Sequence, residues 1–161
     1  MGTINIKKSN ALKAYRSADK SGKSLLENLI GKEILSQNIM DRIKTFEDAC
    51  DEVGTTESQS ILLNYSGVDE ELLAAQAFLK ISIINRSLNE GWKPDWNNSS
   101  EYKYYPWFEA NKSGFGFSYS DYGIWFTHST CGSRLCFKNK ELAIYAGTQF
   151  IDLYNQFLTI K

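Results

Sequence analysis

The sequence predicts an α+β fold, in which a helical N-terminal half precedes a roughly four-stranded antiparallel meander that a long C-terminal helix packs against. Three observations indicate this fold: apolar residues recur every three or four positions before residue 91, four short aromatic or β-branched runs follow residue 101, and a second amphipathic stripe closes the sequence. We expect a single domain over residues 1–161, with a helical portion at 1–91 and the sheet and C-terminal helix at 92–161.

Helix-start and helix-stop residues divide the first half. Ser9 or Asn10 is expected to cap a short segment that ends near residues 21–22, and a leucine-rich stripe at 25–30 is closed by glycine 31. Apolar residues spaced four, three, four and three apart run from Ile39 to Val53 and predict one helix. A longer helix is expected between Asp69 and residue 90, with an apolar surface broad enough to be covered on more than one side.

The second half changes from helical spacing to strand-like runs. Residues 91–100 are rich in Gly, Pro, Asp, Asn and Ser, which predicts a loop. Four runs follow at 102–109, 114–119, 123–128 and 133–137, separated by turn-forming residues. After Asn139, a favourable N-cap, apolar residues at three-four spacing up to Ile160 predict one helix of about twenty residues across the sheet.

Composition and charge narrow the possible functions. The net charge is −1, and no segment holds the clustered excess of Lys and Arg that grips a phosphate backbone. No apolar run is long enough to span a bilayer, and the first residues lack the apolar core of a signal peptide. The three cysteines, Cys50, Cys131 and Cys136, are interpreted as reduced, buried thiols. We therefore expect a soluble protein of the cytoplasm, with no membrane partner.

Five segments carry a resemblance to a known group of proteins. They are 42–50 (RIKTFEDAC), 88–96 (LNEGWKPDW), 101–108 (EYKYYPWF), 132–138 (GSRLCFK) with 141–143 (ELA), and 145–154 (YAGTQFIDLY). Over nearly its whole length the chain resembles an uncharacterised family of gut Bacteroidetes proteins and of Bacteroides phage and prophage proteins. The resemblance implies a bacterial or phage origin and a cytoplasmic or virion-associated location. It implies no activity, cofactor or catalytic residue.

An aromatic cluster is the strongest candidate for a binding surface. Aromatic residues make up 14% of the chain, and every Trp and every Tyr except Tyr15 lies after Asn64. Because side chains alternate between the two faces of a strand, one face meets the helices and the other is open to stack on a partner. The alternative is that the rings fill the core and a partly covered outer face. The candidate binding residues are Trp96, Tyr104, Trp107, Tyr119, Trp125 and Arg134.

Catalytic and metal-binding patterns are weak. His128, the only histidine, lies close in sequence to Cys131, a spacing that suggests a nucleophile and its base. No orienting group or oxyanion-hole motif accompanies them, so a surface or capped histidine in a hairpin is the favoured interpretation of His128. One histidine and three cysteines fit no common zinc spacing, and the glycines at 114–116 and 132 match no phosphate loop. We predict no catalytic residue, cofactor or metal.

Three functions follow from these patterns. The first is a non-catalytic interaction module that binds a protein partner, or itself, through the aromatic sheet face. The second is single-stranded nucleic-acid binding, in which Tyr104, Trp107 and Trp125 stack on bases. The third is a small enzyme that uses His128 or Cys131.

Overall fold

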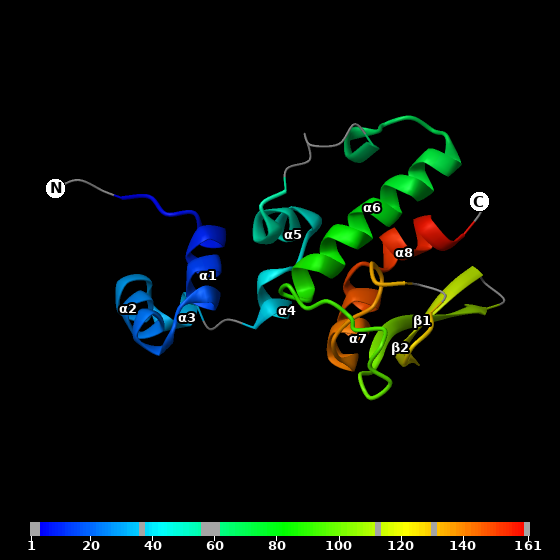
Figure 1. Cartoon of the computed structure of the whole chain (residues 1–161). Helices are drawn as coiled ribbons and strands as arrows, with labels where there is room; N and C mark the ends of the chain where they lie inside the picture. The colour runs from blue at the N-terminus through cyan, green and yellow to red at the C-terminus, as the bar shows by residue number, and fades with distance from the viewer. Residues whose placement is uncertain (1–3, 36–37, 56–61, 112–113, 130–131, 160–161) are drawn as a thin grey trace. The chain divides into compact units, whose positions relative to one another are not determined.

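The computed structural model describes residues 4–35, 38–55, 62–111, 114–129 and 132–159, with the backbone alone at residues 9, 109–111 and 114–121. Over these residues the fold is α+β, as predicted, with eight α-helices and one antiparallel sheet of two strands (Figure 1). Contacts divide the chain into two compact units, Met1–Arg42 and Ile43–Lys161, which we describe separately.

The first unit is a small helical body. It contains α1 (Lys8–Ser17), α2 (Lys20–Ile30), α3 (Lys32–Leu35) and α4 (Ile39–Arg42). Its core cluster consists of Ala11, Leu12 and Leu35, against which Tyr15, Leu26 and Ile30 pack partly buried. No residue of α2 is buried, so this unit removes little apolar surface from water.

The boundary between α1 and α2 differs from the prediction. Residues 21–22 were expected to separate two helices, yet they lie in the first turn of α2. The carboxylate of Asp19 accepts a hydrogen bond from the backbone N–H of Gly22 at 2.8 Å, and this N-cap starts the helix at Lys20. The cap therefore outweighs the turn preference of the Ser-Gly pair.

The single helix predicted from Ile39 to Val53 is interrupted. Helix α4 ends at Arg42, and α5 (Phe46–Val53) begins four residues further on. The hydroxyl of Thr45 accepts from the backbone N–H of Asp48 at 3.1 Å, and the carboxylate of Asp48 accepts from the N–H of Thr45 at 2.9 Å. This capping box starts a new helix, and the apolar spacing alone does not reveal it.

The longest helix, α6 (Glu70–Leu88), begins where predicted, because the side chain of Asp69 accepts from the N–H of Leu72 at 3.0 Å. Its broad apolar surface is covered by more than one element, because both α5 and α8 (Ile151–Leu158) pack against it. The short 3₁₀ turn η2 (Leu62–Asn64) is fixed to α6 by Gln76, whose amide nitrogen donates to the carbonyls of residues 62, 63 and 65.

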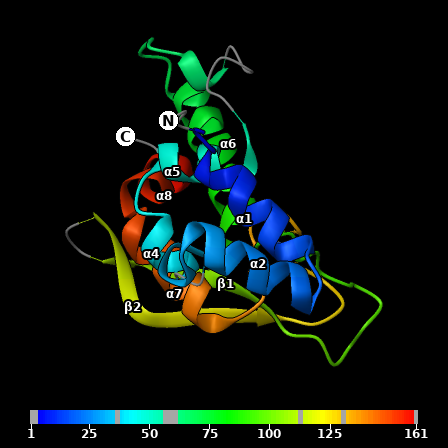
Figure 2. The ribbon, with the colours of Figure 1, turned by 90° about the vertical axis from the view of Figure 1, so that its left-hand side faces the viewer.

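The predicted C-terminal helix is two helices, α7 (Lys140–Gln149) and α8 (Ile151–Leu158). Asn139 caps α7 as predicted and accepts from the N–H of Leu142 at 2.9 Å. The helix breaks at Phe150, where φ is −115° and ψ is 31°. Helix α8 packs on α6, whereas α7 lies against the hairpin (Figures 1 and 2). Because of this break, apolar residues of one continuous stripe pack partly against the hairpin and partly against α6.

The four-stranded meander is wrong. Over the described residues the sheet has two strands, β1 (Lys103–Asn111) and β2 (Gly114–Trp125). The second and third predicted runs form one strand, because β2 continues through residues 120–122, where we expected a turn. Tyr122 pairs with Pro106 and Phe117 pairs with Phe108, so the residues between them bulge opposite Trp107. The polar residues are accommodated in this irregularity.

The fourth predicted run, at 133–137, makes a single bridge between Phe137 and Tyr104. Continuing this antiparallel ladder would place residue 135 opposite Pro106, which has no N–H to donate. The ladder therefore ends after one pair, and the run does not become a strand.

Candidate functional site

One face of the hairpin carries a row of aromatic rings, which we call the tryptophan face: Tyr105, Trp107 and Trp125. The register pairs Lys103 with Trp125 and Tyr105 with Gly123, which places these residues on the same side of the sheet. The ring centroids of Tyr105 and Trp107 are 6.2 Å apart, and those of Tyr105 and Trp125 are 5.2 Å apart, stacked at an interplanar angle of 24°. The rings therefore form a continuous surface.

Gly123 provides the space that the ring of Tyr105 occupies. A Cβ atom at Gly123 would lie 1.8 Å from Cζ of Tyr105, so the ring lies directly over a bare backbone. A glycine inside a strand often marks such a close approach. This position lets Tyr105 cross β2 and reach Trp125.

The accessible part of the tryptophan face is Trp107, whose exposed fraction is 47%. Tyr105 and Trp125 are half-buried, and the exposed His128 lies edge-on to Trp125 at 5.7 Å between ring centroids. The indole Nε1 of Trp125 is buried, and no described group accepts its hydrogen. A buried donor of this kind is uncommon in a folded protein.

Trp96 extends the tryptophan face from the loop that precedes β1. Its Nε1 donates to the hydroxyl of Ser133 at 2.7 Å, and its ring centroid lies 5.5 Å from the ammonium nitrogen of Lys103. Lys103 is on the same side of β1 as Tyr105, because residues two apart in a strand share a face. A cation over an indole ring is attracted by the ring's electrons, which favours this position of Trp96.

Lys103 is completely buried, and its ammonium group is saturated by the protein. Nζ donates to the carbonyl of Asn98 at 3.1 Å and to that of Glu101 at 2.8 Å, and it lies 3.3 Å from the Glu101 carboxylate. The same carboxylate accepts from the backbone N–H of Asp95 at 2.8 Å. Since an ammonium has three donors, Lys103 fixes the 95–101 loop and has none left for a bound anion.

Two asparagines at the end of α6 fix the segment that follows the hairpin. The amide nitrogens of Asn85 and Asn89 donate to the carbonyl of Cys136 at 2.8 and 2.9 Å, and the amide oxygen of Asn89 accepts from the N–H of Lys138 at 3.0 Å. Phe137 lies between these anchors and pairs with Tyr104. The base of the hairpin is therefore tied to α6 through a buried polar network.

The opposite side of the hairpin, which we call the tyrosine face, carries Tyr102, Tyr104, Tyr122, Ile124 and Phe126. Tyr102 meets Phe126 at 5.2 Å between ring centroids, and Tyr104 meets Tyr122 at 5.5 Å. The exposed fractions of Tyr102, Ile124 and Phe126 are 48%, 38% and 43%. Both faces of the hairpin therefore leave apolar ring or side-chain surface in contact with water.

The predicted binding residues fall on different sides. Trp96, Trp107 and Trp125 lie together on the tryptophan face, whereas Tyr104 lies on the tyrosine face because adjacent strand residues alternate. Arg134 is exposed and follows Ser133, which holds Trp96. The side chain of Tyr119 lies outside the described residues.

Two important residues are missing from the predicted set of binding residues, Tyr105 and Lys103. The alternation of residues 103, 105 and 107 along β1 is the signal that would have placed them with Trp107. Of the cysteines, Cys50 and Cys136 are buried, as predicted. Cys131 lies outside the described residues, so the suggested pair with His128 stays a hypothesis.

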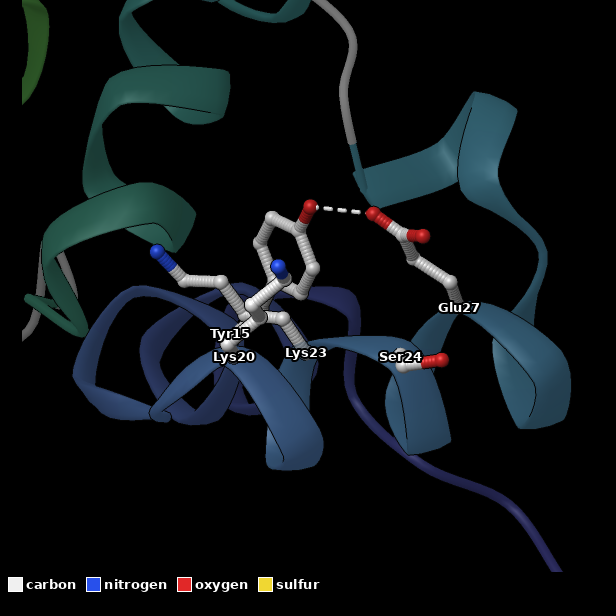
Figure 3. Close-up of a pocket in the computed structure, with 5 residues that line it drawn as sticks. All are labelled: Tyr15, Lys20, Lys23, Ser24 and Glu27. Atoms are coloured by element: carbon white, nitrogen blue, oxygen red, sulfur yellow. Dashed lines mark hydrogen bonds between the residues drawn. The ribbon is translucent and has the colours of Figure 1, made fainter.

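An open pocket of about 450 Å³ lies in the first unit, lined by Tyr15, Lys20, Lys23, Ser24 and Glu27 (Figure 3). The phenol of Tyr15 donates to the carboxylate of Glu27, and the ammonium of Lys23 lies 5.6 Å from the centroid of the Tyr15 ring. The hydrogen bond to Glu27 raises the pKa of Tyr15, with desolvation and the charge of Glu27 acting in the same direction. Tyr15 is thus a neutral donor at physiological pH.

Among the described residues, no three His, Cys, Asp or Glu side chains lie close enough together to hold a metal ion. The same part of the chain contains no helix with the length and apolarity needed to cross a bilayer.

Comparison with models of protein families, with curated proteins and with solved structures finds no match to this chain. The function is therefore argued from the residues of the hairpin and the loops around it.

Proposed function

We propose that this protein is a non-catalytic interaction module that binds a protein partner through the tryptophan face. The observation that carries the proposal is the exposure of Trp107, 47%, at one end of a continuous row of aromatic rings. Exposed apolar surface that is rimmed by polar groups marks interaction sites on soluble proteins. Trp and Tyr are also the residues that most often dominate the binding energy of such sites.

The partner surface that fits this face is apolar or aromatic. The only described cation on the face is Lys103, which the protein itself saturates, so charge attraction does not select the partner there. Exposed polar side chains such as Arg134 and His128 lie in segments that border the face and suit the wet rim of an interface. The resemblance to phage and prophage proteins supports the proposal of a partner in a bacterial cytoplasm or a phage particle.

The anchoring of the hairpin supports the same proposal. Lys103 fixes the loop that carries Trp96, and Asn85 and Asn89 fix the segment that carries Ser133. A binding surface that is ordered before it meets its partner loses less conformational entropy on association. The buried polar network therefore keeps Trp96 and Trp125 in place for binding.

Two rings of nearly equal exposure give a matched test. Trp107, at 47%, lies on the tryptophan face, and Tyr102, at 48%, lies on the tyrosine face. A partner captured from the native host or phage lysate would be purified and titrated by calorimetry against the wild type, Trp107→Ala and Tyr102→Ala. We expect Trp107→Ala to weaken binding about 30-fold or more, as at a hot spot, and Tyr102→Ala to change it little. Equal affinities for the two variants would contradict the proposal.

Single-stranded nucleic-acid binding is the second candidate. The near-parallel stack of Tyr105 and Trp125, continued by the exposed Trp107, favours it, because bases stack on such platforms. The saturated state of Lys103 and the net charge of −1 weigh against it. Titration with oligonucleotides at low salt decides: binding that falls steeply with added salt would favour this candidate, and a flat tryptophan fluorescence signal would dismiss it.

A further inference from the structure

The outer edge of β2 presents unpaired backbone groups. Tyr104 exchanges both backbone hydrogen bonds with Phe137, at 3.0 and 2.7 Å, so its N–H and C=O point away from β2. Ile124 is the partner of Tyr104 in β2, and the two form a pair without mutual backbone hydrogen bonds. In such an antiparallel pair the N–H and C=O groups of both residues point away from the other strand. The backbone groups of Ile124, and of Tyr122 two residues earlier, therefore point away from β1. No backbone hydrogen bond within the described part of the chain satisfies these groups of Tyr122 and Ile124.

The last part of this edge, residues 122–126, lacks the charged residues and prolines that usually prevent a strand from pairing with another chain. Natural edge strands carry Lys, Pro or inward-pointing charges that block a new strand. Residues 122–126 (YGIWF) contain none of these, and all but the glycine are aromatic or β-branched residues that favour strands. The edge is therefore chemically suited to receive another strand.

Apolar side chains beside the same edge would be covered by an added strand. Ile124 is 38% exposed and Phe126 is 43% exposed, and both lie on the tyrosine face with Tyr122. Burial of this surface would add an apolar contribution to the backbone hydrogen bonds. The edge and the exposed side chains thus point to the same contact.

We propose that β2 pairs with β2 of a second copy of the chain, antiparallel and around a two-fold axis at Gly123. This register sets Tyr122 of one copy opposite Ile124 of the other, and both residues present their backbone groups outward, so each such pair exchanges two hydrogen bonds. The segment is uncharged, so two copies do not repel each other, and an aromatic side chain opposite a β-branched one is a favourable cross-strand pair. A two-fold axis uses every contact twice, which makes the surface self-complementary.

The contact goes beyond the proposed function, because it uses the edge of β2 and the tyrosine face. The tryptophan face stays open in the dimer. Failure of one proposal is therefore distinguishable from failure of the other: Trp107→Ala should weaken partner binding without changing the dimer.

The first experiment is sedimentation velocity of the full chain from low-micromolar to millimolar concentration. We expect a reversible dimer for the wild type, for Ile124→Val and for Trp107→Ala, and a dissociation constant at least about tenfold higher for Ile124→Lys. Because the Ile124 side chain is partly exposed and its backbone N–H and C=O point away from β1, the lysine variant should keep the wild-type melting profile by circular dichroism. A wild type that is monomeric at every concentration, or a lysine variant that dimerises as tightly, would overturn the proposal.

The second experiment tests the register by disulfide formation in a Cys131→Ser background. Directly opposed, hydrogen-bonded residues have Cα atoms about 5.5 Å apart, within the range of a disulfide. Mixed Tyr122→Cys and Ile124→Cys chains should therefore cross-link on oxidation, and neither variant alone should do so. Cross-linking of Ile124→Cys with itself would contradict the Gly123-centred register. Hydrogen exchange of residues 122–126 gives a further check. If an added extended peptide of another sequence protects these residues, and a higher concentration of the chain alone does not, the edge binds another partner and the pairing of two copies is overturned.

Discussion

The two compact units of the chain differ in the interactions that stabilise each of them. The unit Ile43–Lys161 buries large apolar side chains and also encloses polar groups that are hydrogen-bonded, such as Lys103 and Asn89. The unit Met1–Arg42 has the small core cluster of Ala11, Leu12 and Leu35, and Leu25 and Leu29 of α2 are 60% and 72% exposed. The larger unit relies on a network of long-range contacts, whereas the Met1–Arg42 unit relies on a few apolar side chains.

This difference indicates where the free energy of unfolding resides. Chains of about 40 residues are near the lower limit for folding without a metal, disulfide or partner, because they bury too small a fraction of their surface. The Met1–Arg42 unit is of that size, so each of its few buried side chains carries a large share of its stability. In the larger unit, the loss of one contact is spread over many others.

The largest effect is expected for Leu12→Ala. Leu12 is 2% exposed, and a buried Leu→Ala change costs about 2–5 kcal/mol, more than so small a core is expected to hold in reserve. We expect α1, α2 and α3 to lose their protection from hydrogen exchange, measured by mass spectrometry. The control is Leu25→Ala in the exposed part of α2, which should change stability by no more than about 0.5 kcal/mol. Intact protection of α1 in the Leu12 variant would show that the unit is more stable than its core indicates.

Lys103→Met should destabilise the larger unit by about 3 kcal/mol. The substitution keeps the length of the side chain but leaves the Glu101 carboxylate and two loop carbonyls without their donor. Urea unfolding followed by tryptophan fluorescence measures the change. The exposed Lys93→Met provides the control and should be close to neutral. A stable Lys103 variant would mean that apolar packing replaces the buried ammonium.

Asn89→Ala should cost about 2 kcal/mol. Its amide holds the backbone on both sides of Phe137 and also donates to Asn85, so truncation leaves the N–H of Lys138 without its acceptor. Thermal unfolding would show the loss, and Asn97→Ala, an exposed asparagine in the loop, serves as the reference. An effect no larger than that of the reference would show that Asn85 alone anchors this segment.

The same contrast explains which parts of the fold could be predicted. Helix starts are local, so Asp69 and Asn139 were identified from neighbouring residues alone. At Thr45 and Phe150 the helix breaks, although the apolar residues on both sides keep helical spacing. The spacing alone therefore does not reveal these breaks. The strand count failed for another reason: turn-forming residues at 118–121 occupy a bulge, and a bulge depends on the partner strand.

The candidate site was predicted only in part for a related reason. The tryptophans were visible as an excess of aromatic residues, but their grouping on one face depends on the register between β1 and β2. The contact of Asn89 with Cys136 joins residues that lie 47 apart, and no local pattern encodes it. Buried polar networks of this kind become apparent only when the elements are in place.

Gly123→Ala should cost about 1–2 kcal/mol, because the added methyl group displaces the ring of Tyr105 and separates it from Trp125. The near-ultraviolet circular dichroism of the stacked rings should decrease in parallel. In a double-mutant cycle, Gly123→Ala should cost much less when Tyr105 is already alanine. An equal loss of stability in both backgrounds would show that the position of the Tyr105 ring does not depend on Gly123.

The smallest effect concerns Tyr15 in the first unit and depends on pH. The hydrogen bond to Glu27 raises the pKa of Tyr15 above its ordinary value of about 10. Because the pKa is higher in the folded state, the contribution of this group to stability is complete below that ordinary value and is lost as pH rises through the folded pKa. The absorbance of tyrosinate, measured for the wild type and for Tyr15→Phe during alkaline titration, gives the curve of Tyr15 by difference. A midpoint above 10 is expected, and a midpoint at or below it would mean that Tyr15 and Glu27 are apart in solution, so that the first unit lacks even this contact between α1 and α2.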